Sequence, residues 1–195
     1  MFKGVGVVVI PTPYTDGKRC QYYARWKNMI RRCYSRNQDN DVVVCDDWLV
    51  YSNFKYWMIQ QEKLHGDLTS LQLDKDILSD GLMYSPSACA FVTAEVNLFV
   101  HVSRKPRNLP IGVTISDRYG YKSQCRNPFD RKSSNHIGYF DTKEDAHEAW
   151  RLKKHEYACR LADIETDPRV SISLRSRYVK CNHDNMETIV NDKYN

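Results

Sequence analysis

LDKDILSDGLMYSPSACAFVTAEVN, residues 73 to 97, is the stretch of sequence that decides the fold of the first half of the chain. Its first residues predict a strand with Asp74 and Asp76 on one face, because strand side chains repeat every two residues. Serine, aspartate, glycine and proline then predict loops and turns at 79–81 and 85–87. The apolar run at 88–92 predicts a second short strand, so the stretch indicates a small hairpin.

A helix is predicted directly after this hairpin. Thr93 has the chemistry of a helix N-cap, and the helix that follows carries Asn97 and, one turn later, His101. The order strand, loop, strand and helix brings Asp74, Asp76 and Asn97 together at one end of the hairpin. Hard oxygen ligands of this kind suit Mg²⁺ or Mn²⁺. The sequence therefore predicts a divalent-metal site made by these three residues.

This pattern resembles the HNH (His-Me finger) nucleases, in the variant found in phage homing-type endonucleases. The resemblance is carried by LDKDIL at 73–78, by the Y-S-P-x-x-C spacing at 84–89 and by ACAFVTAEVN at 88–97. It implies a ββα finger that binds Mg²⁺ or Mn²⁺ and cuts DNA by metal-assisted phosphodiester hydrolysis. At the position of the family's general-base histidine this chain has Lys75, and at the position of its structural asparagine it has Ala88.

The general base is the part of the predicted site that departs from the family pattern. A lysine ammonium, with a pKa of about 10.4, is a poor base at neutral pH unless its pKa is strongly lowered. His65, in a polar segment at 60–71 that reads as turn-rich, offers an imidazole that titrates near neutral pH. The candidate catalytic residues are therefore Asp74, Lys75, Asp76 and His65. The alternative for His65 is that it has no catalytic role.

The residues before the finger predict a helical scaffold. Apolar side chains recur with helical spacing at 21–34, and aromatic side chains do so at 48–58. Short strands are predicted at 5–10 and 42–45, with a Pro/Gly loop at 11–17. The pattern from Tyr23 to Trp57 also resembles the N-terminal part of the same phage family. We therefore expect one HNH-like domain over 1–103.

A second unit is predicted over 104–180, after a basic, proline-containing linker at 104–110, with a polar tail at 181–195. Three strands are predicted at 112–116, 121–126 and 136–140. Thr142 is expected to cap a long helix that ends near Ala162, and Asp167 a last helix with Pro168 at its first position. The fold class expected for the whole chain is α+β.

The second unit resembles the Apetala-type (ethylene-response-factor) DNA-binding domain. The matching residues are Gly112-Val113, Gly138-Tyr139-Phe140, Thr142, Glu144-Asp145-Ala146 and Ala149-Trp150. In that family the sheet enters the DNA major groove, which implies double-stranded DNA as the partner. Phage homing endonucleases often carry this module after an HNH finger, so the two resemblances agree in order.

The charge distribution of this unit also favours DNA. Eight Lys and Arg residues lie between positions 104 and 135 against two Asp, whereas the whole chain has a formal net charge of +5. By strand alternation Lys122, Gln124 and Arg126 share the face opposite Tyr121, Ser123 and Cys125, and the helix is expected to bury the latter face. The candidate DNA-binding residues are Arg118, Tyr121, Lys122, Gln124, Arg126, Arg131 and Lys132.

Composition sets the remaining bounds. With 195 residues, 42% hydrophobic and 12% aromatic, the chain has enough apolar material for a folded core. Seven cysteines without a C-x-x-C pair argue against zinc and favour thiols in a reducing cytoplasm, here that of the phage-infected bacterial host. The apolar run at 5–10 is too short to span a membrane, so no membrane partner is expected.

Two functions remain open on the sequence alone. The first is a sequence-specific DNA endonuclease of the phage homing type. The second is a non-catalytic DNA-binding protein built on a decayed nuclease and acting as a repressor, competitor or anti-defence factor, which Lys75 and Ala88 favour. A single finger cuts one strand at a time, so a double-strand break would need a homodimer or two successive events.

Overall fold

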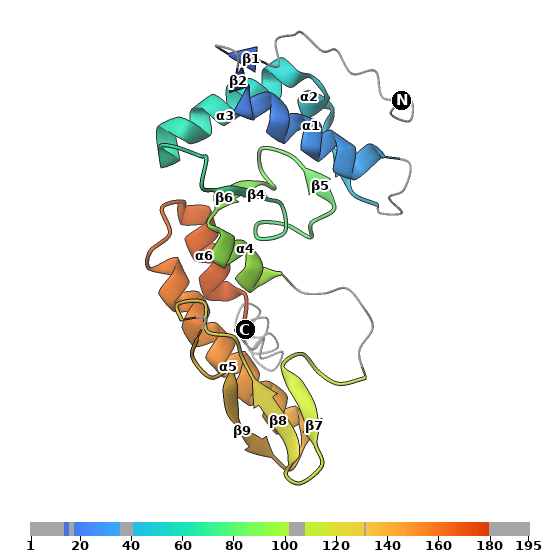
Figure 1. Cartoon of the computed structure of the whole chain (residues 1–195), viewed down its shortest axis with the longest axis vertical. Helices are drawn as coiled ribbons and strands as arrows, with labels where there is room; N and C mark the ends of the chain where they lie inside the picture. Colours follow the sequence, from blue (N-terminus) through green and yellow to red (C-terminus); the bar gives the residue numbers. More distant parts are fainter. Residues whose placement is uncertain (1–13, 16–17, 36–40, 102–107, 131, 180–195) are drawn as a thin grey trace, which may run out of the picture.

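A computed structural model of the chain describes residues 14–15, 18–35, 41–101, 108–130 and 132–179. Its elements follow one another along an elongated molecule, with the N-terminal helices at one end, a small finger in the middle and a three-stranded sheet at the other end (Figure 1). The strand predicted at 5–10, most of the predicted linker, Arg131 and the tail at 181–195 lie outside the described residues.

The N-terminal part begins with a short antiparallel pair, β1 (Tyr14–Thr15) and β2 (Lys18–Arg19), and continues with three helices. These helices are α1 (Gln21–Tyr34), α2 (Asp46–Leu49) and α3 (Tyr51–His65). The prediction of α1 is confirmed, and its buried side chains Trp26, Met29, Ile30 and Cys33 recur at three and four residues.

Helix α3 continues beyond the helical spacing predicted at 48–58 and ends at His65, inside the segment 60–71 that was predicted as turns. Its last polar turn is held by α1, because Glu62 accepts hydrogen bonds from the side chains of Gln21 (3.1 Å) and Tyr22 (2.5 Å). The helix ends at Gly66, whose φ of +75° is in the left-handed region favoured by glycine. Residues 60–64 are Gln, Gln, Glu, Lys and Leu, which are good helix formers, so the extension agrees with local preference and is held by the contacts with α1.

The finger consists of β4 (Gln72–Asp74), β6 (Ala90–Val92) and α4 (Ala94–Val100). The two strands are antiparallel, with Leu73 opposite Phe91, and Thr93 caps α4 by accepting the Val96 N–H. The loop between them carries β5 (Met83–Tyr84), which pairs in parallel with β3 (Val43–Val44) and so ties the finger to the helical scaffold.

The expectation that Asp74 and Asp76 share a strand face is wrong. Strand β4 ends at Asp74, and the Asp74 carboxylate Oδ1 accepts the backbone N–H groups of Asp76 (2.9 Å) and Ile77 (2.7 Å). An aspartate that binds its own backbone two and three residues ahead bends the chain out of the strand. Asp76 therefore lies in a bend that follows the strand, which we call the Asp74 turn (residues 74–77).

The C-terminal part is an antiparallel sheet in the order β7–β8–β9, with two helices. The strands are β7 (Val113–Ser116), β8 (Gly120–Gln124) and β9 (His136–Phe140). Helix α5 (Lys143–Ala162) packs on all three strands, and α6 (Pro168–Ser176) packs on α5. The predicted caps are confirmed, since Thr142 accepts the Asp145 N–H and Asp167 accepts the Arg169 N–H.

Two hydrophobic cores meet at the finger sheet. On one side, Leu73 and Phe91 pack with the helical scaffold. On the other side, the finger residues Ile77, Ala90, Val92, Val96, Phe99 and Val100 pack with residues of α5 and α6 that include Trp150, Tyr157, Leu161, Val170 and Leu174. This second core crosses the boundary predicted near residues 104–110, so the finger and the C-terminal part share buried side chains.

The chain is α+β, as predicted, with helices and small sheets along its length. Among the helices formed by the described residues, none has the length and apolar character needed to cross a membrane.

Candidate nucleic-acid interface and metal site

The outer face of the C-terminal sheet, opposite α5, carries the predicted DNA-contacting side chains of β8. Ser123 and Cys125 are buried on the α5 side, whereas Lys122 and Gln124 are partly exposed and Arg126 is exposed. The alternation predicted for this strand is therefore observed. It arises because α5 covers one face only, so polar side chains can remain hydrated on the other.

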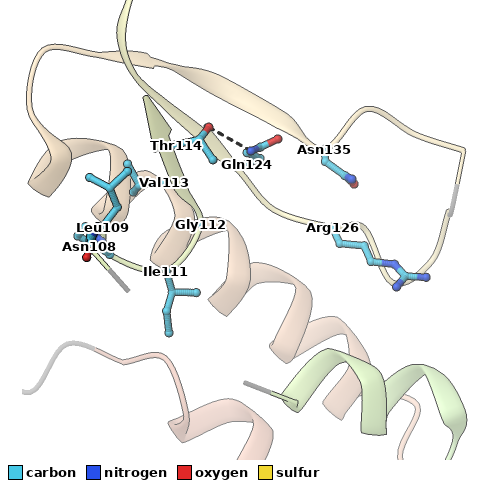
Figure 2. Close-up of a pocket in the computed structure, with 10 residues that line it drawn as sticks. Asn108, Leu109, Ile111, Gly112, Val113, Thr114, Gln124, Arg126 and Asn135 are labelled. Carbon is cyan, nitrogen blue, oxygen red and sulfur yellow. Dashed lines mark hydrogen bonds between the residues drawn. The ribbon is translucent and has the colours of Figure 1, made fainter. Parts of the chain in front are cut away.

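The strand register sets the neighbours of these residues on the outer face. Lys122 lies opposite Thr114 on β7 and opposite Tyr139 on β9, so the three form one row across the sheet. Gln124 lies opposite His136, beside an irregularity at Ser123/Gln124, and its Nε2 donates to Thr114 Oγ1 at 3.2 Å (Figure 2).

Aromatic rings extend this face toward the β7–β8 turn. The rings of Tyr119 and Tyr139 are 4.8 Å apart, that of His136 is 4.7 Å from Tyr139, and the Arg118 guanidinium lies 5.2 Å from the Tyr119 ring. Tyr119 and Tyr139 are about half exposed, at 50% and 47%. Sequence reasoning did not assign Tyr119, Tyr139 and His136 to this face, although the alternation of β9 would have placed Tyr139 there.

Two other predicted residues lie elsewhere. Tyr121 lies opposite Ile115 on β7 and Phe140 on β9. It is two residues from the buried Ser123 on the same strand, so its side chain lies on the α5 side of the sheet. Lys132 is exposed in the connection between β8 and β9, next to Arg131, which lies outside the described residues.

An open groove of about 600 Å³ borders the outer face along the edge strand β7. It is lined by Asn108, Leu109, Pro110, Ile111, Gly112, Val113, Thr114, Gln124, Arg126 and Asn135. Figure 2 shows Gln124 beside Thr114, and Arg126 further along the same segment. The groove therefore joins polar residues of the outer face to an apolar segment at the start of the C-terminal part, which includes Leu109, Pro110 and Ile111.

The candidate metal site lies on the side of the finger sheet that faces α4. Asn97 projects from α4 and its Nδ2 donates to Gln72 Oε1 at 2.5 Å. Gln72 and Asp74 are two residues apart in β4 and so share a strand face. By this alternation Asp74 lies on the strand face that carries Gln72, the hydrogen-bond partner of Asn97.

Asp74 is almost completely buried, with 4% of its surface exposed. Burial raises the pKa of its carboxyl group, the negative charge of Asp76 adds to this rise, and the N–H groups of Ile77 and Asp76 oppose it. Desolvation is thus a larger cause of the raised pKa than the charge of Asp76.

Lys75 is bound within the same turn. Its ammonium lies 2.8 Å from Asp76 Oδ1 and 5.7 Å from the centre of the Tyr84 ring, with 13% of the side chain exposed. This cation therefore stands beside the carboxylate that the sequence assigned to the metal.

His65 contacts a different region. Its Nδ1 lies 3.0 Å from Thr166 Oγ1, in the connection between α5 and α6, and its buried Nε2 has no hydrogen-bond partner among the described residues. Burial lowers the pKa of His65, which favours a neutral imidazole. The hydrogen bond of His65 thus ties α3 to the C-terminal part and not to the Asp74 turn.

The residues present fit an ion such as Mg²⁺, which keeps water or phosphate ligands, better than an ion whose ligands all come from the protein. The described residues contain no group of three or more His, Cys, Asp or Glu side chains arranged to hold a metal. The donors at the finger are the Asp74 and Asp76 carboxylates and the amide oxygen of Asn97, whose nitrogen is already bound to Gln72. Mg²⁺ binds through one or two carboxylates and keeps waters or phosphate oxygens at its other positions.

Comparison of the chain with protein-family models, with curated proteins and with solved structures finds no match in any of the three.

Proposed function

We propose that the protein binds double-stranded DNA through the outer face of the β7–β8–β9 sheet. The observation that carries the proposal is the row Thr114–Lys122–Tyr139, a cation between a hydroxyl and an exposed ring on the face that α5 leaves open. Lysine neutralises phosphates without regard to sequence. A face of this composition, in a segment rich in Lys and Arg, suits a polyanion.

Base recognition is assigned to the neighbouring residues. Gln124 presents a side-chain amide, which pairs bidentately with adenine in the major groove, and arginines such as Arg126 and Arg118 prefer guanine. Gln124 is oriented by its bond to Thr114, so its position is set before DNA arrives. The resemblance to the Apetala-type domain supports the same assignment.

Selection of binding sites from a pool of randomised duplexes tests this function. The proposal expects a recovered consensus and a fall in affinity with rising salt. A pool that shows no enrichment over several rounds, together with no binding at low salt, would refute it.

We further propose that the finger cleaves the bound DNA, which makes the protein a sequence-specific endonuclease. The specific observation that supports this is the β4–β6–α4 arrangement, in which Asn97 binds Gln72 and Asp74 shares the strand face of Gln72. Asp74 and Asn97, with Asp76, would hold Mg²⁺ or Mn²⁺. The ion would supply Lewis-acid stabilisation of the charge that develops on the phosphate and the leaving oxygen.

A non-catalytic DNA-binding protein is the second candidate, and a specific observation favours it. Lys75 is paired with Asp76, and His65 contacts Thr166 in the α5–α6 connection and not the Asp74 turn. Such a protein would bind its site and block it, as a repressor or competitor does.

Plasmid nicking with Mg²⁺ and Mn²⁺ distinguishes the two functions when wild type is compared with Asp74→Asn. This substitution keeps an acceptor oxygen for the Asp74 turn and removes the charge that a metal needs. Nicking that is lost in the variant while DNA affinity is kept supports the endonuclease. Tight DNA binding without nicking by wild type supports the non-catalytic protein.

A further inference from the structure

The Asp74 turn is held from the C-terminal part of the chain as well as by Asp74 itself. Ser173 Oγ, on α6, donates to the carbonyl oxygen of Ile77 at 2.5 Å. Arg177, directly after α6, donates through Nη1 to the carbonyl oxygens of Asp76 at 3.2 Å and Ile77 at 3.4 Å. The N–H groups of the same two residues bind Asp74 Oδ1. Asp74 and α6 thus hold the N–H and carbonyl groups of one short backbone segment.

Helix α6 is itself firmly placed. Val170 and Leu174 are fully buried in the core that also contains Ile77. Ser171 Oγ donates to the carbonyl oxygen of Ala162, the last residue of α5. Because α5 packs on all three strands of the sheet, a continuous series of contacts runs from the proposed DNA-binding face through α5 and α6 to the Asp74 turn.

We propose that Ser173 and Arg177 are positioning residues that set the orientation of the Asp74 carboxylate for metal. Through them the C-terminal part, which binds DNA, determines the geometry of the metal site in the finger. The inference rests on the proposed metal function of Asp74. Groups that orient a metal-binding carboxylate act on metal affinity without touching the ion.

Amide hydrogen exchange in the full chain tests the positioning directly and requires neither metal nor DNA. In Ser173→Ala/Arg177→Ala, the amides of Asp76 and Ile77 should exchange about five- to tenfold faster, because the turn loses its carbonyl partners. The amides in the middle of α5 should keep their rates, which shows that the fold is intact. The single variant Ser173→Ala should give a smaller increase at the same two amides.

Ser176→Ala/Arg175→Ala is the matched control, since it removes the same two side-chain types from the same helix end. Among the described residues, Ser176 bonds to carbonyls of its own helix, and Arg175 bonds to Asp163 in the α5–α6 connection. The control should leave exchange at Asp76 and Ile77 unchanged. Equal rates in wild type and Ser173→Ala/Arg177→Ala, or equal acceleration in the control, would overturn the positioning role.

Mn²⁺ titration followed by electron paramagnetic resonance tests the link to metal. The double variant should bind Mn²⁺ about five- to tenfold more weakly than wild type, and the control should match wild type. If exchange accelerates while Mn²⁺ affinity stays the same, the link to metal is overturned. If wild type binds no Mn²⁺ at all, the metal function of Asp74 fails, while the exchange result still decides whether α6 holds the turn.

Discussion

Gly112 lies against the indole ring of Trp150 so closely that a Cβ atom on Gly112 would overlap the ring atoms Cγ and Cδ1. Its φ of +81° is also in the left-handed region. His147 stacks on the same indole at 5.2 Å, and its Nδ1 lies 2.9 Å from the carbonyl oxygen of Ile111. The contact of Gly112 with Trp150 fixes the start of β7 on α5, and with it the position of the outer face proposed to bind DNA.

Gly112→Ala should therefore destabilise the protein by about 3 kcal/mol or more, since the substitution adds a steric clash to the backbone strain. Gly66→Ala is the control: its φ is +75°, but a Cβ there would have no atom within 4 Å. The control should lose only the backbone cost of about 1–3 kcal/mol. Urea unfolding measures both, and equal losses would show that the Trp150 contact does not constrain residue 112.

Asp74→Ala and Asp74→Asn should separate the structural role of this residue from its charge. Alanine leaves two backbone N–H groups without their acceptor and should cost about 1–3 kcal/mol. Asparagine keeps an acceptor and removes a charge that burial disfavours, so it should lose less stability than alanine at pH 7. Thermal unfolding compares the three proteins, and equal stability of the two variants would contradict the role of the turn bonds.

Lys154 should make stability depend on pH in the alkaline range. Its ammonium donates to the carbonyl oxygen of Phe99 at 2.7 Å, and burial lowers its pKa from 10.5 to about 8. Between these two values the unfolded chain binds more protons than the folded one, so this residue's contribution to the free energy of unfolding rises with pH. Relative to Lys154→Met, wild type should gain stability between pH 8 and pH 10.5, with no relative change below pH 8.

The neighbouring Lys153 provides the control for that measurement. It is paired with Glu156 at 2.7 Å, and this hydrogen bond raises its pKa. Lys153→Met should therefore run parallel to wild type between pH 8 and pH 10.5. Parallel curves for Lys154→Met as well would show that the buried ammonium is not the cause.

Gln124→Ala should relax sequence preference while leaving non-specific affinity nearly unchanged. A good bidentate contact to a base contributes about 1–3 kcal/mol of discrimination, and the amide of Gln124 is the group oriented for it on the outer face. The check is to measure affinities for the selected site and for its single-base variants. A variant protein that still discriminates at every position would assign readout to other residues.

Local signals predicted much of this fold because the elements that carry them are largely self-contained. The spacing of apolar residues predicted α1, and the caps Thr142 and Asp167 predicted where α5 and α6 begin. Alternation predicted which residues of β8 face away from α5. These features depend on neighbours within a few positions, which a sequence displays directly.

What sequence reasoning missed depends on contacts between distant segments or on side chains that bind backbone. The parallel pairing of Val43 with Met83 and the bond of His65 to Thr166 join residues far apart in the chain. Asp76 was misplaced because the Asp74 carboxylate ends the strand that alternation would continue. The hold of Ser173 on the Asp74 turn likewise arises only once α6 is packed.

The most direct test of the central claim, DNA binding through the outer sheet face, is fluorescence anisotropy of a labelled duplex at several salt concentrations. Wild type should show a slope of log K against log salt of about −4 to −5 if roughly five phosphates are neutralised. Lys122→Ala/Arg126→Ala should weaken binding to any sequence about tenfold or more and reduce the magnitude of this slope by one to two, at about one per lost contact. Lys55→Ala/Lys63→Ala removes the same charge from exposed positions on α3, at the far end of the molecule, and should bind like wild type (Figure 1). Equal affinities and slopes for all three proteins, or equal weakening of both variants, would contradict the account.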